Sequence, residues 1–331
     1  MSKRRVPNVP RIVGWSLALI LVICVLVFFI RLAVWNKGVK YIITDEDIAS
    51  IKLDTNDNIT ILPANIFRAD TDDGVPTILV LGNDSYYEGL DDKTAITDYL
   101  SESIPNADII NCCFPGSQLS CYNPHETSPA ECPEDYFTLF YLILGANLND
   151  FSRQNEAMMY LPDDKKSVYQ PILDRFMAVD FNKVDLVLIC YDAHDYLNGV
   201  MPQSPVPTED GIPDVSTFLG TLQLSVGSNA SVYPTIQYAY VSPIFCYATD
   251  PSGNKVASTL YNSGNGTIAD YYNAGRATSD YVGLSFIDML FGVPIHEETA
   301  DDYLEKDGIT PNKKARKEVA DRIAKLIAER L

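Results

Sequence analysis

The chain has 331 residues, 47% of them apolar and 21% charged, which is typical of a globular protein with a packed core and excludes a low-complexity or disordered chain. The formal net charge is −19, although the first forty residues carry seven basic groups and no acidic one. The rest of the chain is therefore strongly acidic, so we expect no nucleic-acid partner, because such a surface repels phosphates.

The N-terminus has the pattern of a membrane anchor. A basic tail, residues 1–11, precedes an apolar run that has no charged residue from Ile12 to Ile30 and spans about 28 Å as a helix. The basic tail predicts a cytoplasmic N-terminus. A cleaved signal peptide is the alternative, but "RLAVWNK" after the run offers no small-x-small cleavage site. We therefore expect a single-pass cell-membrane protein anchored by residues 12–34, with the rest of the chain extracytoplasmic.

The segment that follows, residues 35–75, is expected to be a linker with a short β-hairpin, because apolar residues alternate around a polar turn at 56–58. From there strand-like and helix-like segments alternate to the C-terminus. Apolar and β-branched runs predict strands at 76–82, 107–113, 184–191, 235–245 and 284–290. Helical spacing predicts helices at 92–104, 136–146, 170–179, 215–226, 268–282 and 312–331.

This alternation predicts a domain over 76–331 with a three-layer α/β/α, flavodoxin-like fold and a mainly parallel five-stranded sheet. The last helix should begin with Thr310 as N-cap and Pro311 as its first residue. It should then bury one face, formed by Ala315, Val319, Ile323 and Leu326/Ile327.

Ligands of parallel sheets bind beyond the carboxyl ends of the strands. Three polar segments, Asn83–Tyr87, Phe114–Gln118 and Asp192–Tyr196, directly follow the first three predicted strands. We expect them to meet at one edge of the sheet and to form the functional site there.

The seven cysteines give no pattern of a metal site. Cys24 lies in the expected anchor, and four others, in or just after strand-like runs, read as buried thiols: Cys112, Cys113, Cys190 and Cys246. Cys121 and Cys132 flank a Pro-containing loop, and an oxidising compartment would permit a disulfide between them, a question that the sequence leaves open. The chain has no C-x-x-C pair and only three histidines, so we expect no metal and no cofactor.

Four short segments resemble, in their order, the conserved blocks of the SGNH/GDSL hydrolases. They are "LGNDS" at 81–85, "NCCFPGS" at 111–117, "YDAHDYL" at 191–197 and "DGITPN" at 307–312. The resemblance covers residues 76–331 and is nearest to membrane-anchored SGNH-like proteins of Gram-positive bacteria. It implies a serine hydrolase of esters, often of acetyl groups on sugars.

In that family the first block supplies the serine nucleophile, and the second supplies a glycine whose N–H lines the oxyanion hole. The resemblance therefore implies Ser85 as nucleophile and Gly116 as oxyanion donor. The family spacing is Gly-x-Ser, however, and here the residue two places after Gly82 is Asp84. Ser85 is therefore one position further along the chain than the family's spacing requires.

The last two blocks also depart from the family. In the third, Asp192 stands where a glycine is expected and His194 where an asparagine donor is expected. In the fourth, Asp307 is kept as the acid, but Thr310 replaces the catalytic histidine, and a threonine hydroxyl is no base near neutral pH.

Several roles stay open from the residues alone. His194, flanked by acids, is either a relocated base for Ser85 or a hydrogen-bond donor in place of the asparagine. Asp84 is either a carboxylate nucleophile or cation ligand, or part of an ordinary strand-to-helix turn. Tyr86, Tyr87 and Tyr191 could stack on a sugar ring at the same edge.

Two functions follow. The first is an extracytoplasmic esterase or deacetylase that acts on acylated cell-envelope glycan through Ser85. The alternative is a catalytically inactive module of the same fold that binds or scaffolds in the envelope, which the displaced serine and Thr310 favour.

Overall fold

The computed structural model describes residues 55–62, 74–123, 128–204 and 211–331. The expected cytoplasmic tail at 1–11 and membrane anchor at 12–34 lie outside these ranges. Within the described ranges, none of the helices combines the length and the apolar character that a membrane crossing requires. The anchor stays a prediction.

The predicted parallel sheet is confirmed. Its five strands are all parallel, in the spatial order β2-β1-β3-β4-β7. They are β1 (Thr77–Gly82), β2 (Asp108–Cys113), β3 (Leu186–Cys190), β4 (Gln237–Val241) and β7 (Ser285–Ile287). Every residue of β3, β4 and β7 is buried, because helices cover both faces of the sheet.

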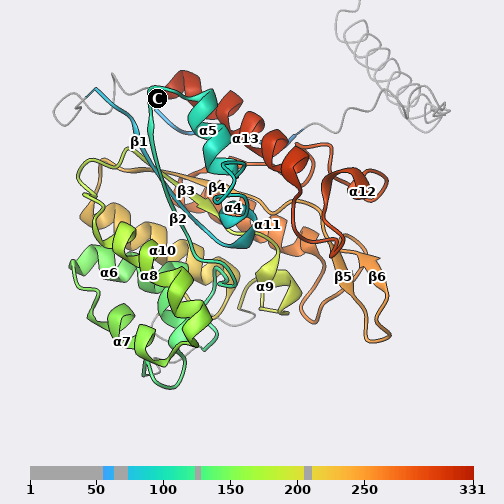
Figure 1. The fold of residues 1–331 in the computed structure, drawn as a ribbon, viewed down its shortest axis with the longest axis horizontal. Coiled ribbons are helices and arrows are strands. Elements are labelled where there is room, and N and C mark those ends of the chain that lie inside the picture. The colour runs from blue at the N-terminus through green and yellow to red at the C-terminus, as the bar shows by residue number, and fades with distance from the viewer. Residues whose placement is uncertain (1–54, 63–73, 124–127, 205–210) are drawn as a thin grey trace, which may run out of the picture. The chain divides into compact units, whose positions relative to one another are not determined.

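Two helical layers enclose the sheet (Figure 1). On one face α5 (Ile96–Ser103) packs against α13 (Lys313–Ile327). On the other face α10 (Phe218–Val232) packs against α6 (Leu139–Leu148) and α11 (Ile268–Val282). The three-layer α/β/α architecture expected from the sequence is therefore confirmed.

Several elements complete the domain. A long helix, α8 (Asp163–Met177), packs on β2 and contains Pro171. The shorter elements are α4 (Asp84–Tyr87), α7 (Ser152–Tyr160), α9 (His194–Leu197), α12 (Ala300–Tyr303), the 3₁₀ turns Pro133–Phe137 and Ala328–Arg330, and the antiparallel pair β5 (Tyr247–Thr249) and β6 (Lys255–Ala257). The helix α7 was not expected from the sequence, because "SRQNEAMMY" is mostly polar and has a weak apolar stripe.

The described part of the expected hairpin, residues 55–62, runs along the outer edge of the sheet. Asn58 and Phe286 of β7 exchange two backbone hydrogen bonds of 2.8 and 2.9 Å in an antiparallel bridge. Arg322 of α13 forms a 2.5 Å ion pair with Asp57. Arg330 donates to the backbone oxygen of Ile61 at 3.0 Å. This stretch is therefore fastened to the domain, whereas the other arm of the hairpin lies outside the described residues.

The predicted start of the last helix is wrong by two residues. Asn312 is the N-cap of α13, and its Oδ1 accepts the N–H groups of Lys314 and Ala315 at 2.9 and 3.1 Å. Thr310 does not cap the helix, because its hydroxyl donates to Asp307 at 2.6 Å. The predicted buried face is confirmed: Ala315, Val319, Ile323 and Ile327 are buried.

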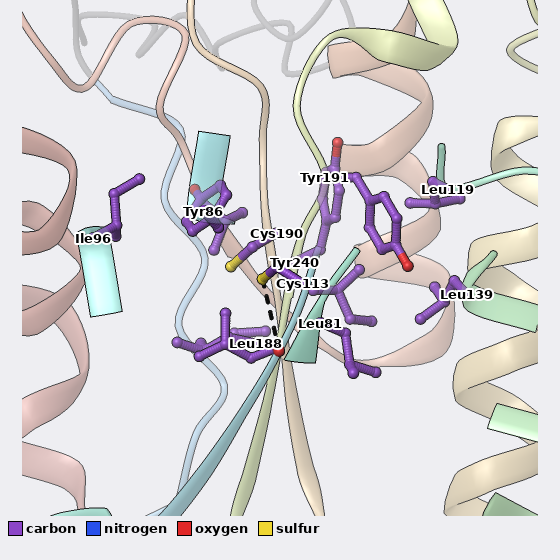
Figure 2. Close-up of a cluster of buried hydrophobic side chains, with 14 of the residues drawn as sticks. Leu81, Tyr86, Ile96, Cys113, Leu119, Leu139, Leu188, Cys190, Tyr191 and Tyr240 are labelled. Carbon is purple, nitrogen blue, oxygen red and sulfur yellow. Dashed lines mark hydrogen bonds between the residues drawn. The ribbon is translucent and has the colours of Figure 1, made fainter. Parts of the chain in front are cut away.

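A tightly packed core lies beneath the carboxyl ends of β1, β2 and β3. Figure 2 shows Cys113 and Cys190 there beside Tyr86, and the thiol of Cys113 reaches the Val80 oxygen at 3.8 Å. The four cysteines expected to be buried are buried, and Cys121 and Cys132 are free thiols in this structure. Gly82 is required at this point, because a Cβ would lie 2.2 Å from the Cys190 oxygen.

Candidate functional site

The tips of the first three strands meet, as the sequence predicts. Asn83, directly after β1, donates from Nδ2 to the Ser117 oxygen at 2.9 Å and to Asp192 Oδ1 at 2.8 Å. Its own Oδ1 accepts the Asp192 N–H at 2.9 Å. Asp195 accepts the N–H groups of Leu119 and Ser120 at 2.8 and 3.0 Å. One buried amide and one buried carboxylate thus tie the three segments into a single site.

Asp192 is the centre of this network. It is buried and accepts from Asn83 Nδ2, from the N–H and hydroxyl of Ser85 at 3.3 and 3.0 Å, and from the N–H and Nδ1 of His194 at 3.1 and 2.5 Å. Burial by itself raises the pKa of this carboxyl, but the His194 charge and these hydrogen bonds outweigh burial and lower it below its usual value. Asp192 is therefore an anion whose two oxygens are both fully used.

Ser85 lies beneath the site rather than in it. It is 4% exposed, and its hydroxyl donates to Asp192. The cavity that it lines holds about 10 Å³, room for one water molecule and no ester. Within the described part of the chain, no imidazole hydrogen-bonds to Ser85; His125 is outside that part. Among the described residues, the arrangement thus gives this serine a carboxylate neighbour but no imidazole base, and no access to a substrate.

Asp84 stands two residues after Gly82, the spacing at which the resemblance implies a serine. Its Oδ2 accepts the N–H of Gly116 at 2.6 Å, and the backbone of Gly116 has φ +74°, a conformation that favours glycine. The Asp84 side chain is 32% exposed and therefore reaches solvent. Burial and the nearby Asp192 charge raise its pKa, while His194 and the Gly116 N–H partly offset this rise.

His194 lies between the two carboxylates. Its Nδ1 is 2.5 Å from Asp192 Oδ1 and its Nε2 is 3.5 Å from Asp84 Oδ2. Burial opposes its charge, but the charge and hydrogen bond of Asp192, followed by Asp84, raise the pKa of His194 to about 9. At neutral pH the ring is therefore an imidazolium, hydrogen-bonded to Asp192 through Nδ1 and ion-paired with Asp84 on its Nε2 side. A protonated imidazole cannot accept a proton, so His194 is not a base at that pH.

Asp307 and Thr310 hydrogen-bond to each other. All the hydrogen bonds of Asp307 stay within its own loop, to the N–H groups of Ile309 and Thr310 and to the Thr310 hydroxyl. Burial would raise the pKa of Asp307, but these hydrogen bonds lower it. Asp307 and Thr310 thus form a local turn, and none of these bonds joins them to Ser85 or His194.

Two of the three tyrosines predicted to stack on a sugar are buried. Tyr86 and Tyr191 are 5% and 1% exposed, and Figure 2 shows both in the core beneath the site. Neither offers a face to a sugar, because their rings pack against the strands. Tyr87 is half-buried beside the core.

The site is a poor fit for a metal ion. Ligand atoms of Asp84, Asp192 and His194 lie within 4.8 Å of one another, the one such group among the described residues. Both oxygens of Asp192 and the Nδ1 of His194 are already engaged. One oxygen of Asp84 and His194 Nε2 remain, and two ligands are fewer than stable sites use.

Comparisons with known proteins bear on the fold alone. No protein-family model and no curated protein sequence matches this chain. One solved structure matches at a TM-score of 0.51 and 15% identity, covering 77% of this chain and 96% of its own. A possible lipase from Chitinophaga pinensis matches at 0.47 and 13%, covering 76% and 96% of the two chains. A putative SGNH hydrolase from Slackia heliotrinireducens matches at 0.41 and 14%, covering 76% and 99%.

The match at a TM-score of 0.51 and 15% identity shows that this chain shares its fold with a solved structure. At these identities the similarity extends to the arrangement of strands and helices. It carries no argument about which reaction, if any, the strand-end site performs.

Proposed function

We propose that this protein is a membrane-anchored, extracytoplasmic module of the SGNH-hydrolase fold that binds in the cell envelope and does not hydrolyse esters through a serine. The observation that carries the proposal is the placement of Ser85. Its hydroxyl is buried and donates to Asp192, while Asp84 takes the exposed position beside the Gly116 N–H.

The chemistry of the neighbouring groups supports this proposal. A serine hydroxyl becomes a useful nucleophile only with a base within hydrogen-bond reach. The carboxylate next to Ser85 has a lowered pKa and is therefore a weak base. The imidazole nearby is protonated at neutral pH. The residue in the position of the family's histidine is Thr310, which has no basic atom.

The ligand that we propose is an acylated cell-envelope glycan, which the resemblance implies. The anchor at residues 12–34 would hold the domain close to this glycan. A direct test measures binding of the full chain in detergent to acetylated envelope glycan, with the same glycan after chemical deacetylation as control. Tighter binding to the acetylated form supports this ligand, and equal binding to both excludes it.

A second experiment tests the absence of turnover. The full chain, S85A and the control S279A are compared for hydrolysis of 4-nitrophenyl acetate. Ser279 is also fully buried, and its hydroxyl donates to a backbone oxygen. We expect all three proteins to release nitrophenol at the uncatalysed rate. Turnover that S85A loses and S279A keeps would establish the esterase instead, with Asp192 as the base 3.0 Å from the hydroxyl.

A further inference from the structure

The Gly116 N–H and the Nε2 of His194 converge on one oxygen atom. Both face Asp84 Oδ2, at 2.6 and 3.5 Å. A backbone N–H that donates to an oxygen and an imidazolium that ion-pairs with the same oxygen together make an anion cradle, because both favour negative charge at that point. Here the atom in the cradle belongs to the protein itself.

We propose that Gly116 and His194 form an intact anion cradle for a small carboxylate, and that Asp84 is a built-in occupant that keeps the cradle filled. The inference rests on the proposed function and deepens it, because a filled cradle cannot stabilise the oxyanion that ester hydrolysis would form. Three features of the structure support it.

The first feature is the backbone of the cradle. The positive φ of Gly116 turns its N–H toward Asp84, and a Cβ added there would meet only the Lys165 side chain, at 3.8 Å. The tip that carries Gly116 is held independently of Asp84, because the Ser117 oxygen accepts from Asn83 Nδ2. The donor should therefore stay in place when the Asp84 carboxylate is removed.

The second feature is the orientation of His194. Its ring is fixed from behind by Asp192, which accepts both its N–H and its Nδ1. This leaves Nε2 as the group that faces the cradle, and the ring orientation does not depend on Asp84. An imidazolium held in this way presents one N–H to an anion, which is the stronger, charge-assisted kind of hydrogen bond.

The third feature is the balance of charge. The acids whose charges act on His194 are Asp192, Asp84 and Asp195. Lys165 stands on the Gly116 side of the cradle, 3.4 Å from Glu134. Because Asp192 and Asp195 are buried and the Asp84 side chain is 32% exposed, Asp84 is the one of these anions that compensates the imidazolium from the solvent side. Without it, that side should accept an anion from solution.

The experiment removes the occupant and offers acetate as the probe. Full-length D84A is compared with the unmodified chain and with D84A/H194Q in 100 mM sodium acetate and in sodium chloride of the same ionic strength. We expect acetate to raise the Tm of D84A by about 3 °C, the shift that binding at roughly ten times the dissociation constant gives a chain of this size. The unmodified chain and D84A/H194Q should show no difference between the two salts.

A second readout follows His194 itself. NMR titration should place the His194 pKa near 9 in the unmodified chain, lower in D84A in chloride, and raised again in acetate. Equal acetate shifts in D84A and D84A/H194Q, or no shift in either, would overturn the proposal. If D84A does not fold, D84N replaces it, and an unchanged His194 pKa in D84N would overturn the proposal as well.

The two proposals fail separately. Ester turnover by the unmodified chain would contradict the proposed function without touching the acetate result. Failure of acetate to bind D84A would remove the cradle and leave the buried Ser85 as it is.

Discussion

The buried carboxylate of Asp192 should hold the three strand tips together, and D192N removes its charge while keeping its shape. An amide has one acceptor oxygen and brings two donors, so it cannot accept all the donors that now point at the two oxygens from Asn83, Ser85 and His194. At least one buried N–H is then left without a partner, which costs about 1–3 kcal/mol, and the His194 imidazolium loses its 2.5 Å anion. Together we expect a loss of about 3 kcal/mol in the free energy of unfolding.

Urea unfolding at pH 7 and calorimetry measure this loss. For a chain of this size about 3 kcal/mol corresponds to a Tm lower by about 6–10 °C. The matched control is D163N, because the Asp163 side chain is fully exposed and its 3.5 Å ion pair with Lys166 lies on the surface. The difference in stability between D192N and the unmodified chain should shrink in acid. Because folding lowers the pKa of Asp192, its charge stabilises the fold fully above the pKa of the unfolded state, and this stabilisation is lost as pH falls through the pKa of the folded state. A D192N chain as stable as D163N would refute this description of the network.

Three further predictions concern stability. Because the His194 pKa is raised to about 9, the charge of His194 should contribute fully to the free energy of unfolding below about pH 6.5, and this contribution should vanish as pH rises through 9. In urea unfolding, H194Q should therefore be less stable than the unmodified chain at pH 6 and equally stable at pH 10. A difference that stays constant with pH would contradict this prediction. R322A removes the ion pair to Asp57, so it should lower the free energy of unfolding by about 1–3 kcal/mol and speed proteolysis at residues 55–62. Unchanged cleavage there would show that this ion pair does not hold the segment to the domain. G82A places a Cβ 2.2 Å from the Cys190 oxygen and should destabilise by about 3 kcal/mol or prevent folding, whereas a normal Tm would show that the strands can separate.

The fold could be predicted from the sequence because its signals are local. The runs at 76–82, 107–113 and 184–191 are apolar on both faces, which is typical of parallel strands covered by helices. Their carboxyl ends carry polar residues, so their convergence follows from topology alone. The segment at 55–62 could not be placed, because its antiparallel bridge to Phe286 joins residues far apart in the sequence.

The site was only partly predictable. The sequence indicates that Asp84 and Ser85 compete for one position, but which of them faces solvent depends on the turn after β1 and on the buried Asp192, which captures the Ser85 hydroxyl. Asn83 joins three strand tips, and the sequence carries no signal of this role beyond the position of the residue after Gly82. A polar residue that directly follows a central, buried strand is the pattern that indicates such a joining role for Asn83.

The predictions of the helix cap and of the stacking tyrosines were wrong for a similar reason. Thr310 has the side chain of an N-cap, but a nearby carboxylate on Asp307 is a better partner for its hydroxyl, so Asn312 caps the helix instead. Tyr86 and Tyr191 belong to a polar-looking edge in the sequence and yet point into the core. Side-chain direction at strand ends is a tertiary property that composition does not carry.

The most direct test of the central claim asks whether Ser85 reacts. The full chain is incubated with a fluorophosphonate, which forms a covalent adduct with activated serine nucleophiles, and is examined by intact mass and peptide mapping. The account predicts no adduct, because the hydroxyl is buried and donates to Asp192. One equivalent of adduct mapped to Ser85, and absent in S85A, would contradict it.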